Sequence, residues 1–210
     1  LFLPYLTNSL AMGAVFLTFF QVIGTYRQIQ AGTAQLGIVN NFLGSLGIEP
    51  INWITGVPLE SQKSLIWELG GVKIPWTKYT IMIIYEVWSG LPFKILILFS
   101  ALQSVNKQYY DAAKIDGASR STVLWKITTP LISPMLSYLL ITGIMGGMKQ
   151  YSAVVGVFGP TMGTNYDMGT MVGYIYQYLE LGQTGYAYAG SLLLFIIIMM
   201  RDILWIKIKK

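Results

Sequence analysis

Long apolar segments constrain this chain more than any other feature of its sequence. A helix needs about 20 mostly apolar residues to cross a bilayer, and the segments 1–24, 79–104, 130–158 (in part) and 183–206 meet that requirement. Only 11% of the residues are charged, against about 25% in soluble domains. The sequence therefore predicts an all-α, polytopic bundle of membrane-spanning helices in one domain, 1–210.

The basic residues predict how this bundle is oriented. Cytoplasmic loops of membrane proteins are enriched in Lys and Arg, whereas the segment 159–182 has neither. We therefore predict that the loop 105–129 and the C-terminus are cytoplasmic and that the segments 25–78 and 159–182 are external, the former as turns and short interfacial helices. The net charge of +5 is then mainly a topology signal and does not indicate a nucleic-acid partner. The basic residues that carry this prediction are Lys107, Lys114, Arg120, Lys126, Lys207, Lys209 and Lys210.

The residue types that are absent narrow the possible chemistry. The chain contains no Cys and no His, which excludes Cys/His zinc sites, Ser-His-Asp triads and histidine switches. No phosphate-binding G-x-x-x-x-G-K-[ST] sequence occurs either, since Gly70-Gly71-Val72-Lys73 lacks that spacing. We predict a protein that is not an enzyme, without catalytic residues, metal ligands or a cofactor of its own.

The loop 105–129 has the composition of a helix, a break and a second helix. Asp111 is expected in the first turn, where a carboxylate complements the helix dipole, and Gly117 can take the left-handed conformation that ends a helix. Ser119 or Ser121 could cap the next helix, and Pro130 is expected to limit it. Taken alone, this pattern is equally compatible with an amphipathic helix that rests on the bilayer.

A longer match in this loop favours a more specific interpretation. The pattern E-A-A, three residues, G, nine residues, I-x-L-P is present here with Asp111 in place of Glu and Thr129 in place of Leu. It resembles the cytoplasmic signature of the membrane subunits of binding-protein-dependent ABC importers, and the string Tyr-Asp-Ala-Ala-Lys-Ile-Asp-Gly-Ala-Ser is similar to their carbohydrate branch. The resemblance continues at Leu3-Pro4, Gly37 to Asn40, Pro50 to Trp53, Trp88 to Phe93 and Gly159-Pro160.

The resemblance implies a type I importer permease with a cytoplasmic coupling helix. Its expected partners are a second homologous permease subunit of different sequence, two cytoplasmic ATPase subunits that bind ATP and Mg²⁺, an extracytoplasmic solute-binding protein and a sugar. Such subunits usually have six or more helices, so about two N-terminal helices are expected to precede Leu1. The residues expected to dock on the ATPase are Tyr110, Asp111, Ala112, Ala113, Asp116, Gly117 and Ala118.

Charges within the spans indicate where a substrate could pass. Such charges are costly and usually face a cavity or a partner, although Glu86 and Lys149 could instead snorkel at a helix end. If Lys94 and Lys149 both face the cavity, an anionic sugar is the sharper prediction. The alternative is a secondary transporter or channel subunit that uses Glu86. From these charges and from the resemblance, the predicted substrate-binding residues are Gly90, Phe93, Lys94, Met148, Lys149 and Tyr151.

Overall fold

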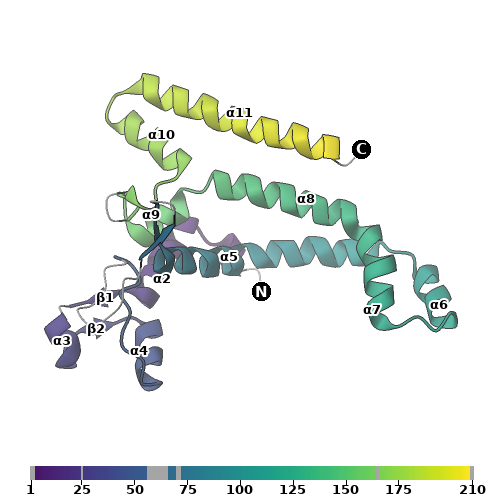
Figure 1. The fold of residues 1–210 in the computed structure, drawn as a ribbon, viewed down its shortest axis with the longest axis horizontal. Helices are drawn as coiled ribbons and strands as arrows, with labels where there is room; N and C mark the ends of the chain where they lie inside the picture. The colour runs from purple at the N-terminus through teal and green to yellow at the C-terminus, as the bar shows by residue number, and fades with distance from the viewer. Residues whose placement is uncertain (1–2, 25, 56–65, 70–71, 164–165, 209–210) are drawn as a thin grey trace.

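The fold is dominated by long helices that run side by side. The computed structural model describes residues 3–24, 26–55, 66–69, 72–163 and 166–208. Among these residues, three helices are long and apolar enough to cross a membrane: α5 (Trp76–Gln103), the continuous helix Arg120–Met148, and Thr184–Arg201 within α11 (Thr184–Ile208). Figure 1 shows α5, α11 and the Thr129–Met148 part of the continuous helix extended in nearly the same direction, while the Arg120–Val123 part turns away. The tail residues Lys209 and Lys210, used in the orientation argument, lie outside the described residues.

The hydrophobic core lies at one end of this bundle. Here α2 (Ser9–Phe20) and α9 (Ser152–Phe158) pack against the first half of α5. Two helices come into backbone contact: a Cβ on Gly13 would lie 2.8 Å from the Gly156 backbone, and one on Gly156 would lie 2.6 Å from the Leu10 carbonyl oxygen. Small residues permit this approach between helices. The core residues include Phe16, Phe20, Ile81, Tyr85, Val154 and Val157.

Short elements extend from the same end of the bundle. β1 (Val22–Ile23) pairs with β2 (Gln35–Leu36), and β3 (Ile66–Leu69) pairs with β4 (Val72–Pro75), both antiparallel. α3 (Tyr26–Gln30) lies between the first pair, and α4 (Ile38–Ser45) follows it. The prediction of turns and short helices for 25–78 thus missed two strand pairs. Buried Asn40 fixes this region, because its side chain bonds the backbone N–H and C=O of Ile51 and accepts from Trp53 Nε1.

The segment 1–24 differs from the predicted single span. It forms α1 (Leu3–Leu6) and α2, which are separated at Asn8 because the Asn8 side chain accepts a hydrogen bond from the Leu10 N–H and caps α2. At 1.5 Å per residue, the 12 residues of α2 are about 18 Å long. This helix is shorter than the hydrocarbon thickness of a bilayer, so the structure does not contain the continuous first span that the sequence predicted.

The helix predicted over 130–158 is shifted in the structure. α7 (Arg120–Val123), the π-helical turn η1 (Leu124–Thr128) and α8 (Thr129–Met148) are continuous, so Pro130 does not limit a separate helix. The reason is local. The Thr129 N–H bonds the Leu124 carbonyl five residues back, and a π turn of this kind can tolerate the missing backbone N–H of Pro130. At the other end, Lys149 to Tyr151 separate α8 from α9.

The segment 159–182, predicted as a loop, contains a helix. α10 (Met171–Glu180) begins at Thr170, whose hydroxyl accepts from the Gly173 N–H, and turns back at Gly182 into α11. Figure 1 shows α10 and α11 as a hairpin above α8. Arg201 in α11 donates from both terminal nitrogens to the Ile141 carbonyl of α8, at 3.0 and 2.9 Å. This contact ties the hairpin to the rest of the bundle.

Candidate functional site: a projecting helix and a polar stripe

A short helix projects from the end of the bundle opposite the core. α6 (Lys107–Ile115) connects α5 to α7 and lies at the far end of Figure 1 from α2 and α9. Asn106 caps its N-terminus by accepting from the Gln108 N–H at 3.0 Å. Gly117 ends it with φ of +67°, and the Ala118 N–H bonds back to the Ala113 carbonyl. Ser119, rather than Ser121, then caps α7 by accepting from the Thr122 N–H.

The predicted docking residues divide between the two faces of α6. Asp111, Ala112, Asp116 and Gly117 are exposed. Ala113 is only 4% exposed, because in this arrangement it packs within the chain, and its role in docking stays a prediction. The remaining predicted residues are half-buried: Tyr110, whose hydroxyl lies 3.3 Å from that of Thr128, and Ala118.

Two features of α6 were not obtained from the sequence. The helix begins at Lys107, so Asp111 lies in its middle and not in its first turn as predicted. Ile115 is 86% exposed, and Tyr109 is exposed as well. In an amphipathic helix an apolar residue usually faces the core, so Ile115 was not predicted as a docking residue. The exposed surface of α6 is thus a small mixed patch of apolar, acidic and basic groups.

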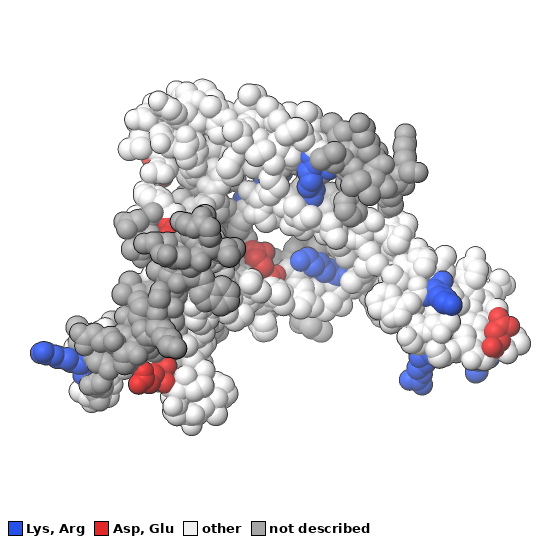
Figure 2. Space-filling model, viewed as in Figure 1, with Lys and Arg blue, Asp and Glu red and all other residues white. Residues whose placement is uncertain are grey.

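A second candidate site follows one face of α5. Glu86, Gly90, Phe93 and Lys94 occupy an arc of about 100° on an ideal helix, and Glu86 and Lys94 are exposed. The buried residues of the same helix, such as Ile81 and Tyr85, lie on a different face and contact the core. In Figure 2 the middle of the molecule carries red and blue side chains among white ones, while other charges lie toward the ends. We call Glu86, Gly90, Phe93 and Lys94 the polar stripe.

Within the polar stripe, two predicted substrate residues are already in contact with other side chains. Lys94 folds back over Gly90: a Cβ on that glycine would lie 3.4 Å from the Lys94 Nζ. One face of the Phe93 ring is covered by Tyr5, with ring centroids 5.1 Å apart and planes at 4°. The Tyr5 ring thus occupies one of the two faces of Phe93. The roles of these residues in binding a substrate stay predictions.

Glu86 is joined to the break between α8 and α9. The Gln150 side-chain amide donates to Glu86, and its oxygen accepts from the Tyr151 N–H. Gln150 was missed in the sequence, because a neutral amide next to Lys149 gives no charge signal; its position beside a predicted site residue was the available clue. The contact places the α8–α9 break against the polar stripe.

The other predicted residues of this region lie at or beside that break. Met148 is the last residue of α8, and the neighbouring Lys149 is exposed. Tyr151 stacks on Tyr176 of α10, with ring centroids 4.5 Å apart. Desolvation, with the nearby charge of Glu180 and the Tyr176 phenol, raises the pKa of Tyr151. Its hydroxyl therefore stays protonated at neutral pH and can donate a hydrogen bond to a ligand.

A buried ion pair closes the core end of α5. Lys78 is fully buried, and its Nζ lies 2.5 Å from Asp167 Oδ2, while the Asp167 side chain is 31% exposed. The loop that presents Asp167 folds tightly: Gly163 has φ of +92°, and a Cβ there would clash with Asp167 Oδ1. An ion pair between distant segments restricts how the loop can lie against the helix. We therefore assign Lys78 and Asp167 to the architecture of this end.

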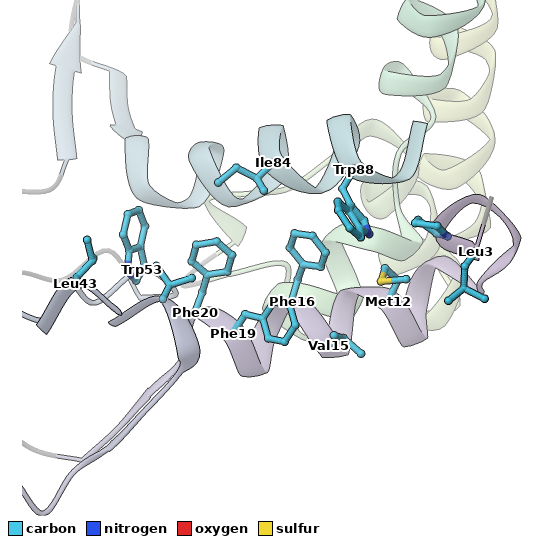
Figure 3. A pocket seen from close by; sticks show the side chains of 12 residues that line it. Leu3, Met12, Val15, Phe16, Phe19, Phe20, Leu43, Trp53, Ile84 and Trp88 are labelled. Carbon is cyan, nitrogen blue, oxygen red and sulfur yellow. The ribbon is translucent and has the colours of Figure 1, made fainter. Parts of the chain in front are cut away.

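The apolar groove between α2, α4 and α5 is chemically different from the polar stripe. Figure 3 shows its lining, in which Phe16, Phe20, Trp53 and Trp88 contribute aromatic rings and no charged side chain takes part. Sugar sites need polar groups that orient hydroxyls, so this groove does not suit such a ligand. Within the described part of the chain, no group of three or more Asp or Glu residues could hold a metal ion.

Comparison with known proteins relates this arrangement to membrane transport. The chain is 27% identical over 209 residues to the arabinooligosaccharides transport system permease protein AraP of Bacillus subtilis, covering 99% of this chain and 57% of that protein. It is 27% identical over 172 residues to the trehalose/maltose transport system permease protein MalF of Thermococcus litoralis, covering 82% and 52%. The chain thus spans about half the length of these relatives.

Solved structures support the same fold. A bacterial ABC transporter involved in the import of the acidic polysaccharide alginate matches with a TM-score of 0.74 and 21% identity, over 100% of this chain and 64% of that one. A bacterial alginate ABC transporter in complex with an alginate pentasaccharide-bound periplasmic protein matches with a TM-score of 0.71 and 21% identity, over 95% and 59%. The predicted importer-type helix bundle is therefore confirmed.

The family assignment covers nearly the whole chain. Residues 2–205 match the family described as binding-protein-dependent transport system inner membrane component. The resemblance inferred from the loop 105–129 is confirmed by this match, and its sugar-transport character by the relatives. The chain belongs to the binding-protein-dependent transport system inner membrane components, the multi-pass permeases of such importers.

Proposed function

We propose that this chain forms half of the membrane pathway of an ATP-driven importer for a sugar or oligosaccharide. Its partners would be a second permease subunit of different sequence, two ATPase subunits that bind ATP and Mg²⁺, and an external solute-binding protein. The permease family and the sugar-transport relatives support this function. Family membership also disfavours the alternative, a secondary transporter that uses Glu86.

The position of α6 is the observation that carries the proposal. α6 follows α5 directly, and after the turn at Gly117 the chain enters the continuous helix Arg120–Met148. A partner bound to the exposed Asp111, Ala112 and Ile115 could therefore move both long helices. Rigid-body rotation of this kind is a common way to switch between two states. ATPase closure would then alternate access to the pathway, with hydrolysis confined to the partner.

The polar stripe is the proposed lining of that pathway. Glu86 and Gln150 provide hydrogen-bonding groups, Gly90 admits the Lys94 ammonium against the backbone, and the face of Phe93 opposite Tyr5 could stack on a sugar ring. Rings that cover C–H faces, with a few polar groups for hydroxyls, are the usual chemistry of a small-molecule site. The predicted residues Lys94, Met148, Lys149 and Tyr151 complete the proposed lining.

We propose the orientation in which α6 and the C-terminus are cytoplasmic. The basic residues Lys107, Lys114, Arg120 and Lys126 cluster around α6 and α7, as expected for the cytoplasmic side. The core end, with α4 and the two strand pairs, would then face the solute-binding protein outside the cell membrane.

The chain offers a matched pair of glycines for testing the docking role. Gly117 and Gly32 have φ of +67° and +69°, and nothing lies within 4 Å of a Cβ built on either. Gly117→Arg and Gly32→Arg therefore impose the same backbone strain at opposite ends of the molecule. We expect Gly117→Arg to abolish sugar-stimulated ATPase activity of the reconstituted complex, with the permease still in the membrane, and Gly32→Arg to retain it. Normal stimulation in the Gly117→Arg complex would refute the docking role.

A further inference from the structure

Lys94 lies deep within a membrane-spanning helix. α5 runs from Trp76 to Gln103. At 1.5 Å per residue, Lys94 is about 27 Å from the start of α5 and about 14 Å from its end. If the hydrocarbon layer of about 30 Å is centred on this helix, the Lys94 Cα lies about 7 Å from the midplane, on the α6 side.

The Lys94 side chain points away from the nearer surface. A lysine that escapes the membrane extends its ammonium toward the closest interface, which for Lys94 is the α6 end. Its Nζ instead lies over Gly90, one helical turn toward the opposite end. The absence of a side chain at Gly90 provides the space for it. The ammonium is thus directed toward the middle of the polar stripe.

Among the side chains that the structure describes, no carboxylate forms an ion pair with Lys94. The ion pair found among these residues joins Lys78 and Asp167. Glu86, the acidic residue of α5, is eight residues from Lys94 and accepts a hydrogen bond from Gln150, and no ion pair joins it to the Lys94 Nζ that lies over Gly90. Lys94 is therefore an exposed cation at membrane depth within the chain, in contrast to Lys78 on the same helix, which is fully buried and paired.

We propose that Lys94 binds an anionic group of the transported substrate, so that the importer selects sugars that carry a carboxylate or a phosphate. This inference rests on the proposed function, and it narrows the substrate to an acidic sugar or oligosaccharide. An ammonium is a compact point charge with three donors, which suits either group. An intramembrane charge of this kind marks a ligand pathway by default, and Lys94 lies in the polar stripe that we assign to it.

The test uses the complete importer with its binding protein, reconstituted in vesicles. The probes are trigalacturonate as a uronate, glucose 6-phosphate as a phosphoester, and maltotriose as a neutral sugar. The variants are Lys94→Met, which keeps the length of the side chain without its charge, and Lys94→Arg, which keeps the charge. Arg27→Met in exposed α3 is the control for loss of a positive charge outside the pathway.

We expect uptake of at least one acidic probe by the unmodified importer. Lys94→Met should lower this uptake by about 10- to 100-fold, the factor that corresponds to one charge-assisted hydrogen bond. Lys94→Arg should restore most of it, and Arg27→Met should leave it unchanged. Which acidic probe is taken up tells a carboxylate from a phosphate substrate.

Three results would overturn the inference, and they can be told apart. Uptake of maltotriose alone, unchanged in Lys94→Met, would reject the anionic substrate while the proposed importer function stands. Failure of the Lys94→Met subunit to assemble with the second permease subunit, with assembly restored in Lys94→Arg, would assign the ammonium to a carboxylate of that subunit. Absence of ATP-dependent uptake for all three probes would count against the proposed function as well.

Discussion

The two ends of the bundle differ in how far their side chains are buried and paired within the chain. At the core end, Ile81 and Val157 are fully buried and Lys78 has its carboxylate within the same chain. At the α6 end, Ile115 is 86% exposed, and the contacts of the short helix are mainly local caps. The core end is thus stabilised by its own packing, whereas the α6 end exposes apolar and charged groups. The difference indicates where changes should affect stability and where they should affect coupling.

The largest effect is expected from Gly156→Val at the core end. Its Cβ would lie 2.6 Å from the Leu10 carbonyl oxygen, and backbone cannot move aside as a side chain can. We expect a loss of at least about 3 kcal/mol in the free energy of unfolding, seen as little monodisperse protein after purification in detergent. Gly143→Val is the control, because a Cβ there has no neighbour within 4 Å. Equal yields for both variants would contradict the proposed α2–α9 contact.

Next, removing either member of the buried ion pair should destabilise the protein, but by different amounts. Asp167→Asn leaves the fully buried Lys78 without its carboxylate, at an expected cost of about 3 kcal/mol. Lys78→Met should cost less, because the Asp167 side chain is 31% exposed and can be hydrated. Thermal unfolding of both variants checks the order. A more damaging Lys78→Met would show that the lysine stabilises the core end mainly by another contact.

At the α6 end, Ile115→Ser should separate coupling from stability. The side chain is 86% exposed, so its loss should leave the unfolding temperature unchanged. Under the proposed function we expect the affinity for the ATPase subunit to fall about tenfold, as for a moderate interface contact. Ile48→Ser, an exposed isoleucine at the core end, is the control. An unchanged affinity in Ile115→Ser would remove this residue from the docking surface.

The smallest effect concerns the cap of α7. The Ser119 hydroxyl accepts from the Thr122 N–H at 3.2 Å, so Ser119→Ala should destabilise the helix start by about 1 kcal/mol. Hydrogen exchange of the amides in 120–123 should accelerate about fivefold. Ser121→Ala, two residues along, should leave these amides unchanged because Ser121 is not the cap. Equal exchange in both variants would contradict the assignment of the cap.

Features carried by local sequence were predicted best. The apolar runs gave the positions of α5 and α11, and Gly117 gave the end of α6. The segment 1–24 was misjudged because its composition is apolar throughout, while one side-chain cap at Asn8 interrupts the helix. α10 was missed because Gly and Tyr residues are typical of loops as well as of interfacial helices.

Contacts between distant segments could not be predicted. Lys78 and Asp167 are 89 residues apart, and Glu86 and Gln150 are 64 apart. No periodicity within a helix links such positions, since each pair depends on how α5 meets the segments that follow α8. The polar stripe itself was partly predictable, because spacings of four residues place Glu86, Gly90 and Lys94 on one face. What that face contacts required the fold.

The π turn η1 has a consequence for how this helix can vary in length. A π turn holds one residue more than an α-helical turn, and η1 lies between the cap at Ser119 and the whole of α8. Deleting one residue within 124–128 would restore an ordinary helix, and because the π turn already absorbs that residue, the angular phase of α8 relative to α7 would change little. Deleting a second residue would rotate α8 by about 100° and separate Gln150 from Glu86. This segment should therefore tolerate the loss of one residue but not of two.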